Sequence, residues 1–254
     1  MSAKPEQRKP DETRECGRRR FLLGAGAAAV ALGPGLFLVV GAEARPPGEA
    51  ASPRQRWGLL IDVSRCTADC DRCVAACRDE FGWGEGAHAD AAQRPEWIRK
   101  VEATPQGGGA TRSLPVMCQH CAKPACADVC PTGASFKRAD GIVLVDRHLC
   151  IGCRYCIMAC PFSARFFVHE DIANQRAYAP RGKGTAEGCT LCVHRVDAGR
   201  QPACVEACQA SGGAMIFGDL NDPASAIAKA LAAHASQSLR PNLDADPGVR
   251  YANL

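Results

Sequence analysis

The stretch that most constrains this 254-residue chain lies at residues 150–161 and reads Cys-Ile-Gly-Cys-Arg-Tyr-Cys-Ile-Met-Ala-Cys-Pro. Three cysteines stand three positions apart, and a fourth follows four positions later, directly before a proline. In this spacing three thiolates hold one [4Fe–4S] cube, whereas the fourth binds a neighbouring cube. A short loop can wrap one corner of a cube and present three sulfurs to three irons. The run therefore predicts a protein built around at least two clusters.

Three further groups of four cysteines have related spacing, so the four groups account for every cysteine except Cys16. One of these groups ends before Pro131, as in the run above, whereas the other two lack the proline. An apolar, partly β-branched segment at residues 57–63 predicts a strand ahead of the earliest group. The three groups are Cys66, Cys70, Cys73 and Cys77; Cys118, Cys121, Cys126 and Cys130; and Cys189, Cys192, Cys204 and Cys208.

The position of the fourth cysteine predicts how the groups pair. The two groups that end in Cys-Pro flank a segment with a hairpin turn at Asp140-Gly141, which is the order of a two-cluster ferredoxin over residues 118–168. Exchange of the fourth cysteine gives the ligand sets of this inner pair, and counting and analogy give those of the outer pair. The four expected sets are Cys118, Cys121, Cys126 and Cys160; Cys150, Cys153, Cys156 and Cys130; Cys66, Cys70, Cys73 and Cys208; and Cys189, Cys192, Cys204 and Cys77.

We expect an α+β fold of two ferredoxin-like modules of the βαββαβ type, one nested within the sequence of the other, with loop insertions. Strands are also expected at residues 97–102 and 214–217. A helix is expected to begin at Asp222 as N-cap, with Pro223 in its first turn, and to end near His234. An irregular tail should follow. The expected segments are an export signal (1–44), a linker (45–56), the first half of the outer module with an insertion (57–117), the inner module (118–168), the second half of the outer module (169–220), and the C-terminal helix and tail (221–254).

The first 44 residues have the pattern of a twin-arginine export signal. Arg18-Arg19-Arg20-Phe21-Leu22 precedes an apolar stretch that runs to Gly41, and Ala42-Glu43-Ala44 is a small-x-small cleavage site. A retained membrane anchor is the alternative, but the stretch is short and its centre is Gly-Pro-Gly. The twin-arginine route carries folded proteins, so clusters can be inserted before export. We therefore expect a periplasmic protein, and we assign Cys16 no role.

Other interpretations of the cysteines fit less well. Zinc ribbons use cysteines in twos, whereas these fall in runs of four, and cysteines two or three positions apart seldom form good disulfides. His120 and His194 lie beside cysteines and are expected to be loop residues rather than ligands. The net charge is only +4, and no basic stripe predicts nucleic-acid binding. No nucleophile–base arrangement or phosphate-binding loop predicts a catalytic site.

The cysteine intervals resemble those of a known family. Over residues 57–220, the four groups are similar to the four-cluster electron-transfer subunits of dimethyl-sulfoxide, polysulfide and formate-dependent nitrite reductase systems. The twin-arginine signal and the sequence Cys77-Arg-Asp-Glu-Phe81 resemble the branch that serves the Dsr membrane complex of sulfur-metabolising bacteria. The resemblance implies a subunit without bond chemistry of its own. Its partners would be an integral membrane quinone-reactive subunit and a periplasmic multihaem cytochrome.

The favoured hypothesis is thus a periplasmic subunit that relays single electrons through four [4Fe–4S] clusters in dissimilatory sulfur metabolism. The second hypothesis is the electron-transfer subunit of a periplasmic molybdopterin reductase, nitrite reductase or hydrogenase system. The third is a secreted zinc or disulfide scaffold, which would be colourless.

Overall fold

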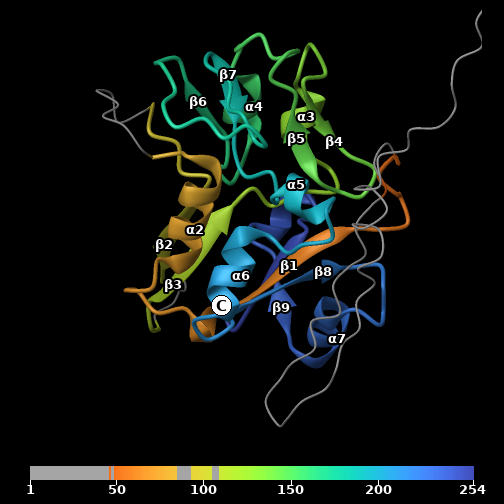
Figure 1. The fold of residues 1–254 in the computed structure, drawn as a ribbon. Helices are drawn as coiled ribbons and strands as arrows, with labels where there is room; N and C mark the ends of the chain where they lie inside the picture. Colours follow the sequence, from red (N-terminus) through yellow and green to blue (C-terminus); the bar gives the residue numbers. More distant parts are fainter. Residues whose placement is uncertain (1–45, 47–48, 85–92, 105–108) are drawn as a thin grey trace, which may run out of the picture. The chain divides into compact units, whose positions relative to one another are not determined.

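A computed structural model of the protein describes residue 46 and residues 49–84, 93–104 and 109–254. The expected export signal, its cleavage site and Cys16 lie outside the described residues, as does part of the insertion before the second cysteine group. The described part is a mixed α/β fold with small sheets and short helices, as Figure 1 shows. It includes all sixteen cysteines of the four groups.

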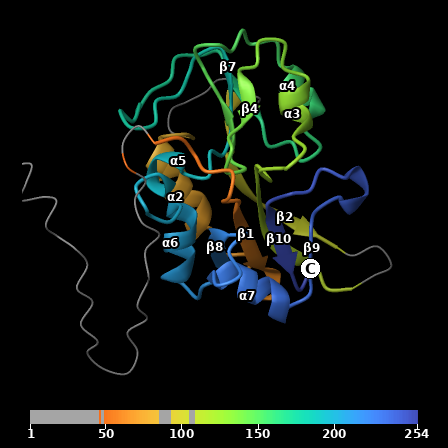
Figure 2. The ribbon, with the colours of Figure 1, turned by 90° about the vertical axis from the view of Figure 1, so that its right-hand side faces the viewer.

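The largest sheet has four strands in the order β8-β1-β10-β9, comprising Met215–Asp219, Trp57–Asp62, Val249–Ala252 and Ser236–Gln237. Strand β1 runs parallel to β10 and antiparallel to β8. Its side chains alternate between two cores. Leu59 and Ile61 lie in the core that also contains cysteines, whereas Leu60 packs with Ile227 of helix α7 (Ala226–Ala233) on the other face. Figure 2 shows α7 beside this sheet.

Two expectations for the C-terminal region are wrong. The tail is not irregular, because Val249–Ala252 forms β10, whose Tyr251 is fully buried and bonded to Pro115 and Gln119. Helix α7 begins at Ala226, and its N-cap is Ser225, whose Oγ accepts from the Ala228 N–H at 3.1 Å. Asp222 instead accepts from the Ala224 N–H and closes a separate turn.

Three antiparallel strand pairs complete the sheets. They are β2 (Ile98–Ala103) with β3 (Arg112–Met117), β4 (Ser135–Lys137) with β5 (Val143–Val145), and β6 (Phe166–Val168) with β7 (Thr185–Glu187). The β4–β5 pair is the hairpin predicted around Asp140-Gly141, and Gly141 has a φ of 86° that favours glycine.

The other helices are short and several bear cysteines. Helices shorter than about 12 residues are marginal alone, so these depend on packing. Helix α2 ends at Gly82, which adopts the left-handed conformation common after a helix. The helices are η1 (Val63–Arg65), α2 (Arg72–Phe81), α3 (Ala125–Asp128), α4 (Tyr155–Ala159), α5 (Val193–Val196), α6 (Ala203–Gln209) and η3 (Pro241–Leu243).

The buried cysteines are divided between two apolar cores. One core includes Cys73 and Cys77 of α2 with Cys192 and Cys204, whereas the other includes Cys118, Cys126 and Cys156. In both ribbon views α3, α4 and strands β4–β7 gather at one end of the described fold, away from α7 (Figures 1 and 2). Among the described residues, we find no helix with the length and apolarity needed to span a membrane.

Candidate metal centres

Cysteines from distant parts of the chain lie close enough to shift one another's pKa values. Burial raises the pKa of Cys73 to about 12, and the neighbouring thiolates of Cys208, Cys66 and Cys70 add to the rise. Lys100 acts in the opposite direction. Helix α6, which bears Cys208, therefore brings that residue to the three earlier cysteines.

Helix α2 contributes its other cysteine to a second group. Cys77 is buried, and this burial, followed by Cys189, Cys204 and Cys192, raises its pKa well above the usual value. Helix α2 packs against α6, and this packing places Cys77 near cysteines that lie more than a hundred positions later in the sequence. Cys77 thus neighbours the fourth group and not only its own.

The two Cys-Pro groups exchange neighbours in the same way. Burial raises the pKa of Cys121 to about 12, with further contributions from Cys118, Cys126 and Cys160. These four cysteines line one cavity of about 290 Å³, which is also lined by Arg165. The fourth cysteine of one run therefore faces the first three of the other.

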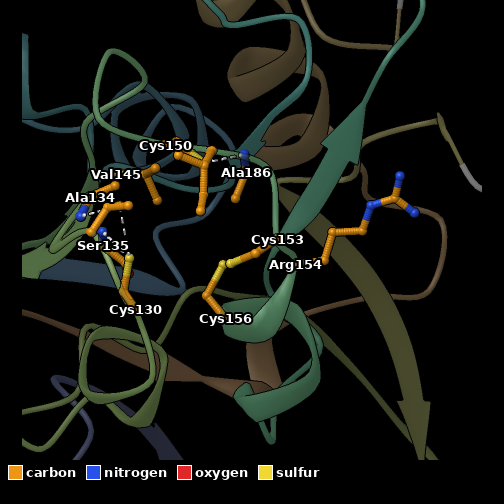
Figure 3. Close-up of a pocket in the computed structure, with 11 residues that line it drawn as sticks. Cys130, Ala134, Ser135, Val145, Cys150, Cys153, Arg154, Cys156 and Ala186 are labelled. Carbon is orange, nitrogen blue, oxygen red and sulfur yellow. Dashed lines mark hydrogen bonds between the residues drawn. The ribbon is translucent and has the colours of Figure 1, made fainter.

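The remaining group surrounds the pocket of Figure 3. Burial raises the pKa of Cys156 to about 11; Arg165 acts against this rise, and Cys126, Cys150 and Cys130 add to it. Figure 3 shows the side chains of Cys153 and Cys156 directed toward each other, whereas Arg154 points away. The structure therefore brings together cysteines of each expected set.

Some cysteines also affect a cysteine of another group, and these contacts order the groups. The thiolate of Cys126 acts on Cys156, that of Cys118 on Cys189, and that of Cys73 on Cys204. Each link joins a different pair of groups. The links thus connect Cys156 to Cys126, Cys118 to Cys189 and Cys204 to Cys73.

N–H groups point at many of the sulfurs, as expected for thiolates that bind iron. Trp83 Nε1 donates to Cys77 Sγ at 3.3 Å and Arg165 Nη2 to Cys126 Sγ at 3.7 Å. Hydrogen bonds to sulfur tune iron–sulfur clusters. Backbone N–H groups also donate at 3.3–3.5 Å, from Ser135 to Cys130, Ala164 to Cys160, Ala186 to Cys150, Leu191 to Cys189 and Ala203 to Cys192.

The loops around the cysteines turn their N–H groups inward through left-handed residues. His120, Arg154 and Cys192 have φ values of 44°, 65° and 47°, and Gly152 has a φ of 72°. Successive N–H groups in such conformations form concave anion sites that are common around iron–sulfur clusters. Thiol chemistry and loop geometry therefore both fit [4Fe–4S] clusters.

The two histidines do not compete with the cysteines. His120 is buried, its Nδ1 accepts from the Val143 N–H at 3.0 Å, and burial followed by Arg165 lowers its pKa to about 3. His194 Nε2 pairs with Glu80 at 2.8 Å. In the described part of the chain, no three His, Cys, Asp or Glu side chains are close enough to hold a single metal ion. A cube does not require such closeness, since each sulfur binds its own iron.

Two functional features were not anticipated from the sequence. Trp83 and Arg165 contact sulfurs although both lie outside the cysteine groups. Large apolar side chains are also exposed around the third group, where Cys153 is itself exposed. They are Leu149, Ile151, Tyr155 and Met158, the last being 74% exposed. No spacing in the sequence marks either feature, because both depend on which residues the fold buries.

The chain is similar to known proteins over most of its length. Residues 110–220 match the family model described as a 4Fe-4S dicluster domain. The chain is 39% identical to the Hdr-like menaquinol oxidoreductase iron-sulfur subunit 1 of Archaeoglobus fulgidus, over 93% of this chain and 98% of that protein. It is also 39% identical to one subunit of the tetrathionate reductase of Salmonella typhimurium, covering 94% and 89% of the two chains. A third relative, protein NrfC of Escherichia coli, is 39% identical over 84% and 85%.

Proposed function

Because this chain belongs to the family of iron–sulfur electron-transfer subunits of oxidoreductase complexes, we propose that it relays single electrons between a membrane quinone-reactive subunit and a redox partner. Four [4Fe–4S] clusters fit its sixteen grouped cysteines. When bound, the clusters supply the one-electron carriers. The polypeptide supplies the thiolates, the N–H donors and the apolar walls that keep water out.

The proposed ligand sets are those expected from the sequence. They are supported by the neighbours of Cys73, Cys77 and Cys121, whose cysteine neighbours include members of the same proposed set from the partner run, and by Cys156, which neighbours Cys150 and Cys130 of its set as well as Cys126 of the adjacent one. The single observation that carries the proposal is this convergence of distant cysteines into four groups. We also propose that the two nested ferredoxin-like modules correspond to the two cysteine-containing cores.

The proposed relay has two ends, because the groups follow one another in one order. At one end, the set of Cys130, Cys150, Cys153 and Cys156 has an exposed ligand and exposed apolar neighbours. We propose that this end meets the membrane quinone-reactive subunit, since an exposed cluster needs a partner to exclude water from it. The set of Cys66, Cys70, Cys73 and Cys208 would then face the other partner, for which a multihaem cytochrome remains our proposal.

The proposed setting is the periplasm, after export by the twin-arginine route, in dissimilatory sulfur metabolism. The Arg-Arg-x-Phe-Leu sequence supports the export proposal. A second candidate is the corresponding subunit of a periplasmic reductase, and it is favoured by the similarity to the tetrathionate reductase subunit and to NrfC. Isolation of the native complex from membranes, with identification of its other subunits, separates the two: a catalytic reductase subunit would support the second.

Anaerobic preparation of the full chain tests the shared proposal. We expect brown protein with about 16 iron atoms per chain and a reducible cubane signal in electron paramagnetic resonance. Iron-replete protein without such a signal, or colourless protein that contains zinc, would refute electron transfer by this chain.

A further inference from the structure

Arg165 is a buried cation in the middle of the cysteine groups. Only 5% of it is exposed, although it stands just five residues after Cys160 and directly before strand β6. Its Nη2 donates to Cys126 Sγ at 3.7 Å and to Ser135 Oγ at 3.4 Å. It lines the cavity that Cys118, Cys121 and Cys160 also line.

Arg165 lies beside cysteines of both Cys-Pro groups. The cavity that it lines is formed by Cys118, Cys121 and Cys126 of one group and by Cys160 of the other. Its other partner, Ser135, donates its backbone N–H to Cys130 Sγ at 3.3 Å, so Arg165 contacts the surroundings of both inner ligand sets. By contrast, the basic side chain beside the Cys66 group is Lys100, whose Nζ donates to the Cys70 carbonyl at 3.2 Å.

Other basic side chains near the cysteines have other partners or more solvent. Arg195 lies near Cys192, but it pairs with Glu80 at 2.9 Å and Glu206 at 2.7 Å, so its charge is largely balanced. Lys100 is partly exposed and donates to the Thr67 and Cys70 carbonyls. Arg165 instead directs its guanidinium at a cysteine sulfur and a serine hydroxyl.

A guanidinium cannot lose its proton in a protein, so its burial must be offset by negative charge. The sulfur ligands of a cluster provide that charge. Reduction adds one more negative charge, and a fixed cation in a poorly screened interior stabilises the reduced form more than the oxidised form. The net charge and hydrogen bonds around a cluster set its potential.

We propose that Arg165 raises the reduction potentials of the two clusters held by the Cys-Pro groups, acting as a fixed positive charge shared between them. This inference rests on the proposed ligand sets. Arg165 acts through its charge and does not bind iron. It makes the two inner clusters easier to reduce than they would be with their thiolate ligands alone. The set of Cys66, Cys70, Cys73 and Cys208 has Lys100 beside it instead, so its potential should not depend on Arg165.

The test is a potentiometric titration of the anaerobic full-length protein, followed by electron paramagnetic resonance. In R165Q the equilibrium constants for reduction of the inner clusters should fall at least tenfold, which is about 59 mV for a one-electron step. At least one of the reduction steps should stay unchanged. R165K keeps a charge and should lie between R165Q and the wild type.

The matched control is R240Q. Arg240 is exposed and donates to the carbonyl of Pro161, beside Cys160, so the same substitution removes a solvent-screened charge near the same cluster. R240Q should leave all potentials unchanged. Unchanged potentials in R165Q, an equal fall in every step, or R165K values equal to those of R165Q would overturn the inference.

A variant that fails to assemble its clusters is interpreted from its iron content. If R165Q loses clusters and R165K retains all four, the inner clusters require the positive charge, which supports the inference. If both lose them, shape rather than charge is needed and the inference fails. A wild-type protein without iron or a cubane signal would instead remove the proposed function, so the two failures are distinguishable.

Discussion

Trp83 and Arg165 contact cysteine sulfurs, yet the spacing that revealed the cysteines does not reveal them. A ligand run is local, because one loop must wrap one corner of a cube, and its intervals therefore appear in the sequence. A sulfur's hydrogen-bond donor is chosen by packing. Trp83 reaches Cys77 because both are buried against the same core, and it resembles any other core tryptophan in the sequence.

Replacing Trp83 by phenylalanine should lower the potential of the cluster proposed at Cys77. The ring volume is largely kept, but the Nε1–H bond to the sulfur is lost. A neutral hydrogen bond is worth about 1 kcal/mol, or about 40 mV for one electron. Redox titration measures the shift, and Trp57→Phe, which changes a tryptophan stacked on Phe217 in the same core, is the control. A shift of the same size in the control would contradict the role of the bond.

Paired alanine substitutions test the proposed exchange of the fourth cysteines. If Cys77 and Cys204 bind the same cluster, the double variant should keep about 12 iron atoms per chain, like each single variant. Cys77 and Cys73 would belong to different clusters, so their double variant should keep about 8. Iron analysis of anaerobic protein measures both. The reverse result would mean that each run binds its own cluster.

At the scale of elements, strands were predicted better than the start of a helix. The strand at residues 57–63 and the hairpin at Asp140-Gly141 were predicted from apolar runs and turn residues, and both are present. Asp222-Pro223 has the composition of a helix start, but Ser225 is the N-cap of the helix. Both Asp222 and Ser225 are residues that can cap a helix, and Asp222 instead closes the turn before it. Strand β10 was missed since four residues between turn-forming residues give little signal, and its stability depends on pairing with the distant β1, on pairing with β9 and on the burial of Tyr251.

The ion pair of Arg181 and Glu187 connects β7 to the end of α2. The guanidinium bonds both carboxylate oxygens, at 2.9 and 2.7 Å, and also donates to the Gly82 carbonyl. Both side chains are almost fully buried. Removing one partner leaves the other as an unpaired buried charge, so Arg181→Met should lower the free energy of unfolding by about 3–5 kcal/mol.

Anaerobic denaturant titration of the cluster-loaded protein measures that loss. The control is the double variant Arg181→Met with Glu187→Leu, which removes both charges and should recover most of the stability. If the double variant is no more stable than the single one, the lost hydrogen bonds to the backbone, and not the unpaired Glu187 carboxylate, account for the loss of stability.

At the scale of the whole molecule, the exposed apolar side chains near Cys153 are proposed to meet the membrane partner. Met158→Glu places a charge on a side chain that is 74% exposed, so it should leave stability within about 0.5 kcal/mol. It should weaken association with the membrane complex at least tenfold, because a charge would be buried at the contact. Co-purification of the chain with membranes measures this.

The control for Met158→Glu is Tyr178→Glu, which changes an exposed aromatic residue that bonds the Glu80 carbonyl, outside the third cysteine group. It should leave association intact. Equal co-purification of both variants with the wild type would place the membrane contact elsewhere.

The parallel pairing of β1 with β10 has a consequence for biosynthesis. All sixteen grouped cysteines lie between these two strands in the sequence. At about 5–20 residues per second, a ribosome needs roughly ten to forty seconds to reach Val249 after it has finished β1. During that interval β1 lacks its parallel neighbour, so the largest sheet can close only after every grouped cysteine has been synthesised.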